Sequence, residues 1–235
     1  MEFPAVGIKL SPRFPGMPLV RASACEHGCA KCEEICPTGA ITLVEGKPAL
    51  DLGRCVVCGK CAELCPGVFK FTKEYRLAAR KRDELFRCDE IMKRTRTLDD
   101  GIKKLFGRSL KLRQVSAGGC AACEAYCNVL QTLTFDLGRF GIQFVASPRH
   151  ADGLLITGPV TQNMKLALQK TYDAAPGPKI VIAAGACAIS GGIYAGHPET
   201  AGIPKEMPVD LYIPGCPPHP LTILDGLLRL LGRIE

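Results

Sequence analysis

The sequence lacks the features that mark several common classes of protein. No apolar run approaches the ~20 residues that a helix needs to span a bilayer. Neither G-x-G-x-x-G nor G-x-x-x-x-G-K-[ST] occurs, so we expect no dinucleotide and no nucleoside triphosphate on this chain. The first residues show no basic region followed by an apolar one, and no twin arginine, which predicts that the chain is not exported.

Cysteine, in contrast, is abundant: the 235 residues include fourteen of them. In a reducing cytoplasm cysteines persist as thiols, so we expect metal ligands here and not disulfides. A hydrophobic content of 47% at this length is enough for one domain of ordinary size together with a smaller one.

The N-terminal cysteines form two sets, and the last three of each set recur at an offset of 29 residues. Each set ends in Cys-Pro. The second set is the C-x2-C-x2-C-x3-C-P run of bacterial ferredoxins, in which the fourth cysteine ligates the other cluster. This rule predicts two [4Fe–4S] clusters with crossed ligands: Cys25, Cys29, Cys32 and Cys65 for the first, and Cys55, Cys58, Cys61 and Cys36 for the second.

The first set departs from the ferredoxin pattern, because three residues separate Cys25 from Cys29 where the family has two. Cys25 is therefore the least secure ligand, and a three-iron cluster or ligation by His27 stays open. A pair of zinc knuckles is the alternative for both sets, but zinc would not require the repeated Cys-Pro. Between the sets, residues 41–44 and 49–51 predict a β-hairpin.

The segments on either side of these cysteines differ in composition. Residues 1–21, rich in proline and glycine, predict an extended arm before a ferredoxin-like domain at 22–69. Residues 70–109 predict a basic helical connector, since 70–111 hold fourteen Lys or Arg against seven Asp or Glu. Its charge would form a solvated face, or would dock on an acidic partner or an anionic lipid surface.

Scattered aromatic residues in this segment and the lack of a groove-reading motif argue against nucleic-acid binding. The isolated Cys88 is interpreted as a structural residue.

From residue 110 to residue 235, strand-like and helix-like runs alternate. We predict strands at 110–115, 141–146, 153–157, 179–184 and 209–213, and helices at 122–137, 160–173 and 220–231. This alternation indicates an α/β domain with a mainly parallel sheet, whose ligands gather at the carboxyl ends of the strands.

Four cysteines can meet at that edge of the sheet. Cys120, Cys187 and Cys216 each follow a predicted strand, and Cys123 completes a C-x2-C pair with Cys120. Glycines beside three of the four let the backbone approach a bulky inorganic cluster, which favours a third [4Fe–4S] site over structural zinc. Cys127, one helical turn after Cys123, is interpreted as a buried helix residue. Residues 158–161 are interpreted as an ordinary helix start, with an anion site as the alternative.

Five ordered motifs after residue 110 resemble those of a known family, the small subunit of membrane-bound, complex-I-related [NiFe] hydrogenases of the formate hydrogenlyase type. They are similar, more distantly, to the 20 kDa subunit of complex I. The motifs occupy residues 119–124, 147–152, 156–161, 185–188 and 214–218. The complex I subunit typically has adjacent cysteines at the first motif and Gln in place of His150, so the resemblance favours the hydrogenase branch.

The resemblance implies a flavodoxin-like domain whose cubane, held by Cys120, Cys123, Cys187 and Cys216, lies nearest the [NiFe] centre of a separate large subunit. The chain would be the non-catalytic iron–sulfur subunit of an oxidoreductase complex, held peripherally by membrane-arm subunits on the cytoplasmic side of the membrane. Three [4Fe–4S] clusters would exchange electrons with a soluble ferredoxin or a formate dehydrogenase module. In relatives the two-cluster ferredoxin is usually a separate subunit, whereas here it precedes the small-subunit domain.

Glu124, next to Cys123, has two interpretations. It is either a carboxylate favoured by the dipole at a helix start or, less favoured, a proton relay. For the whole chain, two further functions stay open. One is the electron-transfer subunit of a complex-I-like oxidoreductase with a quinone or another acceptor, and the other is a non-enzymatic interaction protein stabilised by zinc.

Overall fold

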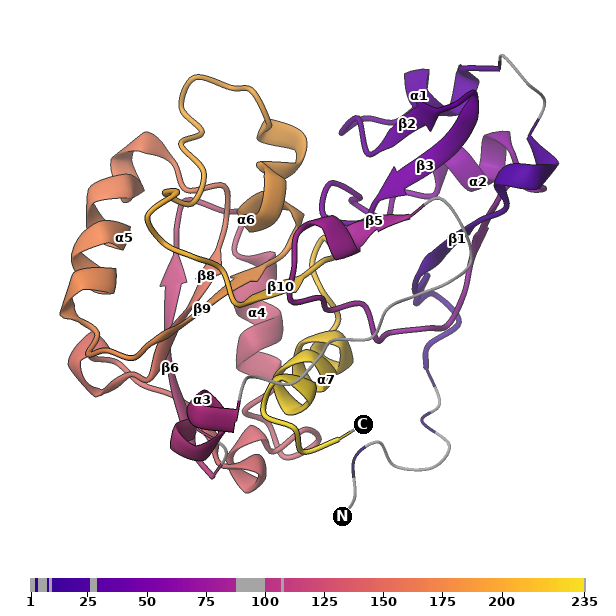
Figure 1. The fold of residues 1–235 in the computed structure, drawn as a ribbon. Coiled ribbons are helices and arrows are strands. Elements are labelled where there is room, and N and C mark those ends of the chain that lie inside the picture. The colour runs from indigo at the N-terminus through magenta and orange to yellow at the C-terminus, as the bar shows by residue number, and fades with distance from the viewer. Residues whose placement is uncertain are drawn as a thin grey trace.

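The computed structural model describes residue 3, residue 8 and residues 10–25, 29–87, 100–106 and 108–234. Figure 1 shows a larger part, built on a five-stranded sheet, beside a smaller part with a three-stranded sheet. In the described ranges, no helix combines the length and the apolar character that a bilayer crossing requires.

The five-stranded sheet has the order β10-β9-β8-β6-β7, and every neighbouring pair is parallel. Its strands are β6 (Leu110–Ser116), β7 (Ile142–Phe144), β8 (Gly153–Thr157), β9 (Ile180–Ala184) and β10 (Leu211–Ile213). All residues of β8 and β9 are buried, as expected for central parallel strands covered on both faces. The predicted fold class, an α/β domain with a parallel sheet, is confirmed.

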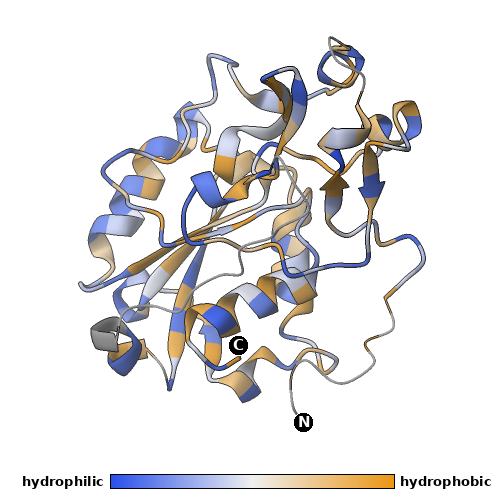
Figure 2. Ribbon diagram, turned by 45° about the vertical axis from the view of Figure 1, so that its right-hand side comes forward, coloured by the Kyte–Doolittle hydropathy of each residue, from blue (hydrophilic) through white to orange (hydrophobic). Residues whose placement is uncertain are grey.

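Helices cover both faces of this sheet. Side chains of α4 (Ala122–Val129) and α7 (Pro220–Leu230) share a core with one face, and α5 (Gln162–Ala174) packs on the other. All of α7 is buried, whereas α5 alternates between hydrophobic and hydrophilic residues, as Figure 2 shows. The short helix α6 (Ala186–Ser190) was not predicted, because five residues carry too little periodicity to reveal a helix.

The helix predicted at 122–137 ends early, at Val129. The Thr132 hydroxyl donates to the Val129 carbonyl at 2.7 Å, a local bond that competes with helix propagation. The chain then turns, and Leu133, which lies within the predicted helix range, is 99% exposed. A 3-10 helix, η3 (Leu137–Phe140), follows and leads into β7.

The smaller part contains the predicted hairpin, β2 (Ile41–Val44) and β3 (Lys47–Asp51), with β5 (Phe86–Arg87) added antiparallel to β3. Its helices are short: α1 (Lys31–Glu34) and α2 (Lys60–Leu64). The end of the predicted arm forms β1 (Pro18–Val20), which pairs with β4 (Phe69–Phe71). Lys73 Nζ also donates to the Pro12 carbonyl at 2.7 Å, so the described arm residues are held against this part.

The predicted connector, 70–109, is not helical over residues 70–87. They contain the end of β4, a 3-10 helix η2 (Asp83–Leu85) and β5. Of the described residues of the connector, those in an α-helix belong to α3 (Asp100–Phe106). Tertiary pairing overrides the helical pattern, since β4 and β5 bond to other strands and Ala79 forms an antiparallel bridge with Tyr212 of β10. The Cys88 prediction lies outside the described residues.

The sheet core yields a stability prediction with a matched control. Leu155→Ala removes a fully buried side chain from β8, the central strand, and should cost about 2–5 kcal/mol. Leu133→Ala makes the same chemical change at the exposed turn. Thermal unfolding of the anaerobically purified chain should show a lower midpoint for the first variant and no change for the second. Equal midpoints would contradict the assignment of the core.

Candidate metal centres

Twelve cysteines fall into three groups, which we name by their predicted ligand sets. Set A is Cys25, Cys29, Cys32 and Cys65; set B is Cys36, Cys55, Cys58 and Cys61; set C is Cys120, Cys123, Cys187 and Cys216. All twelve are free thiols in the described part of the chain.

Set C lies at the carboxyl ends of the parallel strands. Cys120 follows β6, Cys123 is in the first turn of α4, Cys187 is in α6 directly after β9, and Cys216 follows β10. Burial, with the charges of Cys216 and Cys120, raises the pKa of Cys187 to about 11. Burial and neighbouring charges, including those of Cys187 and Cys216, also raise the pKa of Cys123. The four thiols of set C are therefore close enough to interact electrostatically.

The backbone next to set C leaves room for the Cys123 thiol because residue 185 is a glycine, which has no side chain. Gly185 precedes α6 with a φ of +94°, a conformation that favours glycine. A Cβ at this position would lie 2.7 Å from Cys123 Sγ. The glycine beside a predicted ligand thus allows a close approach of thiol and backbone, as a bulky cluster requires.

In sets A and B, the thiols that influence one another come from both halves of the cysteine repeat. Burial raises the pKa of Cys32, and the charges of Cys65 and Cys25 add to the effect. In set B, burial raises the pKa of Cys55 to about 12, with contributions from Cys61, Cys36 and Cys58. Cys65 therefore lies with the first set and Cys36 with the second. Ligation itself stays a prediction.

Cys29 lies two residues before α1, the helix that carries Cys32. Residues 26–28, which include the alternative ligand His27, lie outside the described residues.

The surroundings of set B also suit a sulfur-bound cluster. The Ala40 amide donates to Cys36 Sγ at 3.2 Å, and the Val57 amide donates to Cys55 Sγ at 3.4 Å. All four cysteines of the set line one cavity. Hydrogen bonds to the ligand sulfurs help to set the reduction potential of an iron–sulfur cluster.

A single metal ion fits these sets less well than a cluster does. Within the described ranges, no three His, Cys, Asp or Glu side chains converge as ligands of one ion. Zinc would need thiolate sulfurs about 2.3 Å from one centre. A cubane spans a larger space between its four thiolates than one zinc ion does, and [4Fe–4S] ligation by these sets stays a prediction.

Glu124 is fixed by two hydroxyl groups that the sequence analysis did not identify. Its Oε1 accepts from Thr157 Oγ1 at 2.6 Å and from Ser116 Oγ at 2.7 Å. Partial burial raises the pKa of Glu124, but these hydrogen bonds outweigh it, and the net effect is a lowered pKa. A carboxylate that resists protonation is a poor proton relay at neutral pH, which favours the interpretation as an anchored helix-start residue. Ser116 ends β6 and Thr157 ends β8, and their alignment across the two paired strands is visible only in the folded sheet.

Comparisons with known proteins identify relatives of the C-terminal part of the chain. The family described as "NADH ubiquinone oxidoreductase, 20 Kd subunit" matches residues 120–230. The "Probable membrane-bound hydrogenase subunit mbhJ" of Pyrococcus furiosus is 42% identical over 132 residues, covering 56% of this chain and 79% of that protein. The chain belongs to this family.

Two further relatives of this chain have names that point to different complexes. Formate hydrogenlyase subunit 7 of Escherichia coli is 45% identical over 133 residues, 56% of this chain and 52% of that protein. An NADH-quinone oxidoreductase subunit of Citrifermentans bemidjiense is 46% identical over 116 residues, 49% of this chain and 68% of that protein. The family match begins at Cys120, so sets A and B lie outside it.

Gly185 supplies a prediction for set C. Gly185→Ala forces an unfavourable φ and places a methyl group against Cys123 Sγ, so it should remove the set C cluster alone. Iron in anaerobically purified protein is expected to fall from about twelve to about eight atoms per chain, four for each cubane. Gly177→Ala, whose Cβ meets nothing within 4 Å, should retain the full content. Full iron in Gly185→Ala would contradict the assignment.

Proposed function

We propose that this chain is the electron-transfer subunit of a membrane-associated [NiFe] hydrogenase complex. It relays electrons between a ferredoxin or formate-linked donor and the [NiFe] centre of a separate large subunit. The chain itself is non-catalytic and is held by membrane-arm subunits at the cytoplasmic side of the membrane. The names of two relatives, a membrane-bound hydrogenase subunit and a formate hydrogenlyase subunit, support this proposal.

Each thiol set holds one [4Fe–4S] cluster in this proposal, and each cluster takes up and releases one electron. Residues 22–69 form the ferredoxin-like domain with sets A and B, and residues 110–235 form the family domain with set C. Residues 1–21 form an N-terminal arm, and residues 70–109 connect the two domains. The chain supplies the thiolates and the amide groups that donate to their sulfurs.

One observation supports the relay most directly: the segments that carry sets B and C face one another. Val56 and Val57, between two cysteines of set B, line a cavity of about 340 Å³ together with Cys216 of set C. The cysteine charges that act on Cys32 of set A are those of Cys65 and Cys25, in the same set. The proposed order of electron transfer is therefore from set A to set B and then to set C, or the reverse.

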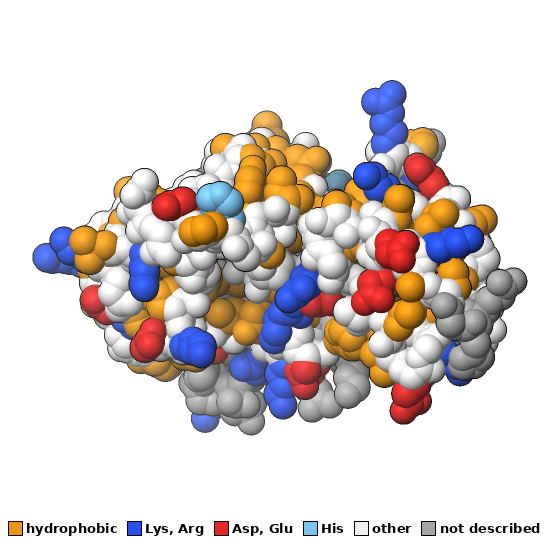
Figure 3. All heavy atoms as spheres, turned by 90° about the horizontal axis from the view of Figure 1, so that it is seen from above, with side chains coloured by type: hydrophobic (Ala, Val, Ile, Leu, Met, Phe, Trp, Pro, Cys, Tyr) orange, Lys and Arg blue, Asp and Glu red, His pale blue; other side chains and the backbone are white. Residues whose placement is uncertain are grey.

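The hydrogenase assignment is favoured over a quinone-linked one by the Cys120-x2-Cys123 spacing and by His150. His150 ends a 3-10 turn, η4 (Pro148–His150), and is exposed, as a residue at a subunit interface would be in the isolated chain. The face seen in Figure 3 carries hydrophobic side chains among charged ones. The relative named as an NADH-quinone oxidoreductase subunit keeps the complex-I-like function as the second candidate.

Crossed ligation can be tested within the ferredoxin-like domain. Cys65→Ala should disturb the cluster of set A, although Cys65 follows the set B cysteines in sequence, because its charge acts on Cys32. Cys36→Ala is the reciprocal control and should disturb the cluster of set B. Electron paramagnetic resonance of the reduced variants distinguishes the two clusters. If Cys65→Ala removes the same signals as Cys55→Ala, the crossing is refuted.

Metal analysis and the identity of the partner test the function as a whole. We expect about twelve irons per chain with equal acid-labile sulfide, and a co-purified large subunit with two C-x2-C motifs, as a [NiFe] centre requires. Mass spectrometry of that large subunit separates the candidates: its lack of the paired motifs would favour the complex-I-like function. Stoichiometric zinc without sulfide would instead identify a zinc-stabilised interaction protein.

A further inference from the structure

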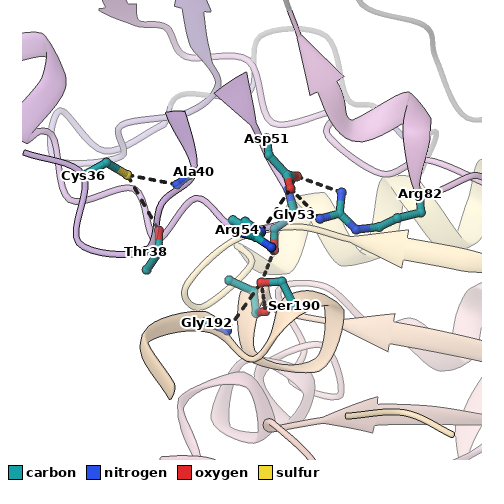
Figure 4. Close-up of polar contacts among 10 residues, drawn as sticks. Cys36, Thr38, Ala40, Asp51, Gly53, Arg54, Arg82, Ser190 and Gly192 are labelled. Carbon is teal, nitrogen blue, oxygen red and sulfur yellow. Dashed lines mark hydrogen bonds and ion pairs between the residues drawn. The ribbon is translucent and has the colours of Figure 1, made fainter. Parts of the chain in front are cut away.

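The turn that leads into Cys55 lies directly against the helix that carries Cys187. Ser190, the last residue of α6, places its hydroxyl 3.0 Å from the Gly53 carbonyl oxygen, to which it donates (Figure 4). Gly53 is two residues before Cys55, and Ser190 is three residues after Cys187. A single hydrogen bond thus closes a short connection along the chain between set B and set C.

Gly53 is needed for this contact because of space. Its φ is not positive, so an ordinary residue could adopt its backbone conformation. A Cβ on Gly53, however, would lie 2.8 Å from Ile189 Cγ2 and 2.8 Å from Arg82 Cζ. Any side chain here must push the turn away from α6 or displace Arg82.

The other side of the turn is clamped by Asp51, the last residue of β3, which is buried. Its Oδ1 accepts from the Gly53 amide at 2.8 Å and from Arg82 Nη1 at 2.7 Å, and its Oδ2 accepts from Arg82 Nη2 (Figure 4). The Asp51 carbonyl accepts from the Cys55 amide at 3.1 Å. Charge-assisted hydrogen bonds thus fix the turn to the end of β3 and to Arg82.

Ser190 is also fixed within its own segment. Its hydroxyl lies 3.0 Å from the Ala186 carbonyl oxygen, and the Gly192 amide approaches it at 3.4 Å. Ala186 and Gly192 lie on either side of Cys187 along the chain. The Ser190 hydroxyl consequently connects the backbone around a set C cysteine to the turn before a set B cysteine.

We propose that Gly53 and Ser190 are positioning residues that set the separation of the set B and set C clusters and so control electron transfer between them. This inference rests on the proposed function. A cluster held by set B would give up one electron and a cluster held by set C would gain it, or the reverse. No bond forms or breaks and no proton is needed. Because electron transfer slows steeply with distance, a displaced turn slows this step.

The test uses the full chain, purified anaerobically with its clusters, and does not depend on hydrogenase activity. When neighbouring clusters are both reduced and paramagnetic, their spins interact and split the resonance signals, and the splitting falls as the clusters move apart. Gly53→Ala should reduce the splitting between the set B and set C clusters while iron content stays unchanged. Gly138→Ala is the matched control, since the nearest atom to its Cβ is a side-chain oxygen at 3.8 Å.

Two more variants keep the test decisive if Gly53→Ala fails to fold. Ser190→Ala removes the bridging hydroxyl and should weaken the splitting, whereas Ser190→Thr, which keeps a hydroxyl, should retain more of it. Adding Ile189→Ala to Gly53→Ala removes one of the two colliding groups and should recover part of the splitting.

Unchanged splitting in iron-replete Gly53→Ala overturns the inference, as does unchanged splitting in Ser190→Ala when only that variant folds. Either result leaves the proposed function in place. The reverse case is distinct: an unaltered chain without iron and sulfide contradicts the proposed function itself.

Discussion

The burial of clustered thiols, with repulsion between their anionic forms as a smaller effect, is the constraint on which the functional end of this molecule depends. At the edge of the parallel sheet, burial and neighbouring charges raise the pKa of Cys123 and Cys187. Without a positive centre among them, the thiols would remain protonated. Iron supplies that positive charge in the proposed clusters, and the fold's contribution is to keep the thiols close although they repel one another as anions.

Rigid surroundings are what make such crowding possible. Apolar strands β8 and β9 are buried completely, and helices on both faces lock them in place. The loops that follow strands β6, β9 and β10 begin from this fixed edge. Fixed backbone also joins the two parts of the chain, where the Ala79 bridge to Tyr212 and the Ser190 hydrogen bond hold the smaller part against the larger one.

Local sequence was a poor guide where tertiary contacts compete with it. The pattern after Cys123 continues on one helical face to Leu137, yet α4 ends at Val129, where a threonine hydroxyl bonds back to the chain. The composition of residues 70–87 predicts a basic helix, but their backbone groups bond to β1, β3 and β10. The anchoring of Glu124 by Ser116 and Thr157 required strand ends that no sequence pattern aligns.

The sequence by itself determined the cysteine sets, the alternation of strands and helices and the family resemblance, because spacing and hydrophobic periodicity are local properties that survive without a fold. Only the tertiary structure decided which thiol sets face one another. That depends on Gly53 meeting α6 and on Asp51 holding Arg82, contacts between residues far apart in the chain. Contacts between residues far apart in the chain produce no local sequence pattern. They can therefore be identified only in the folded structure.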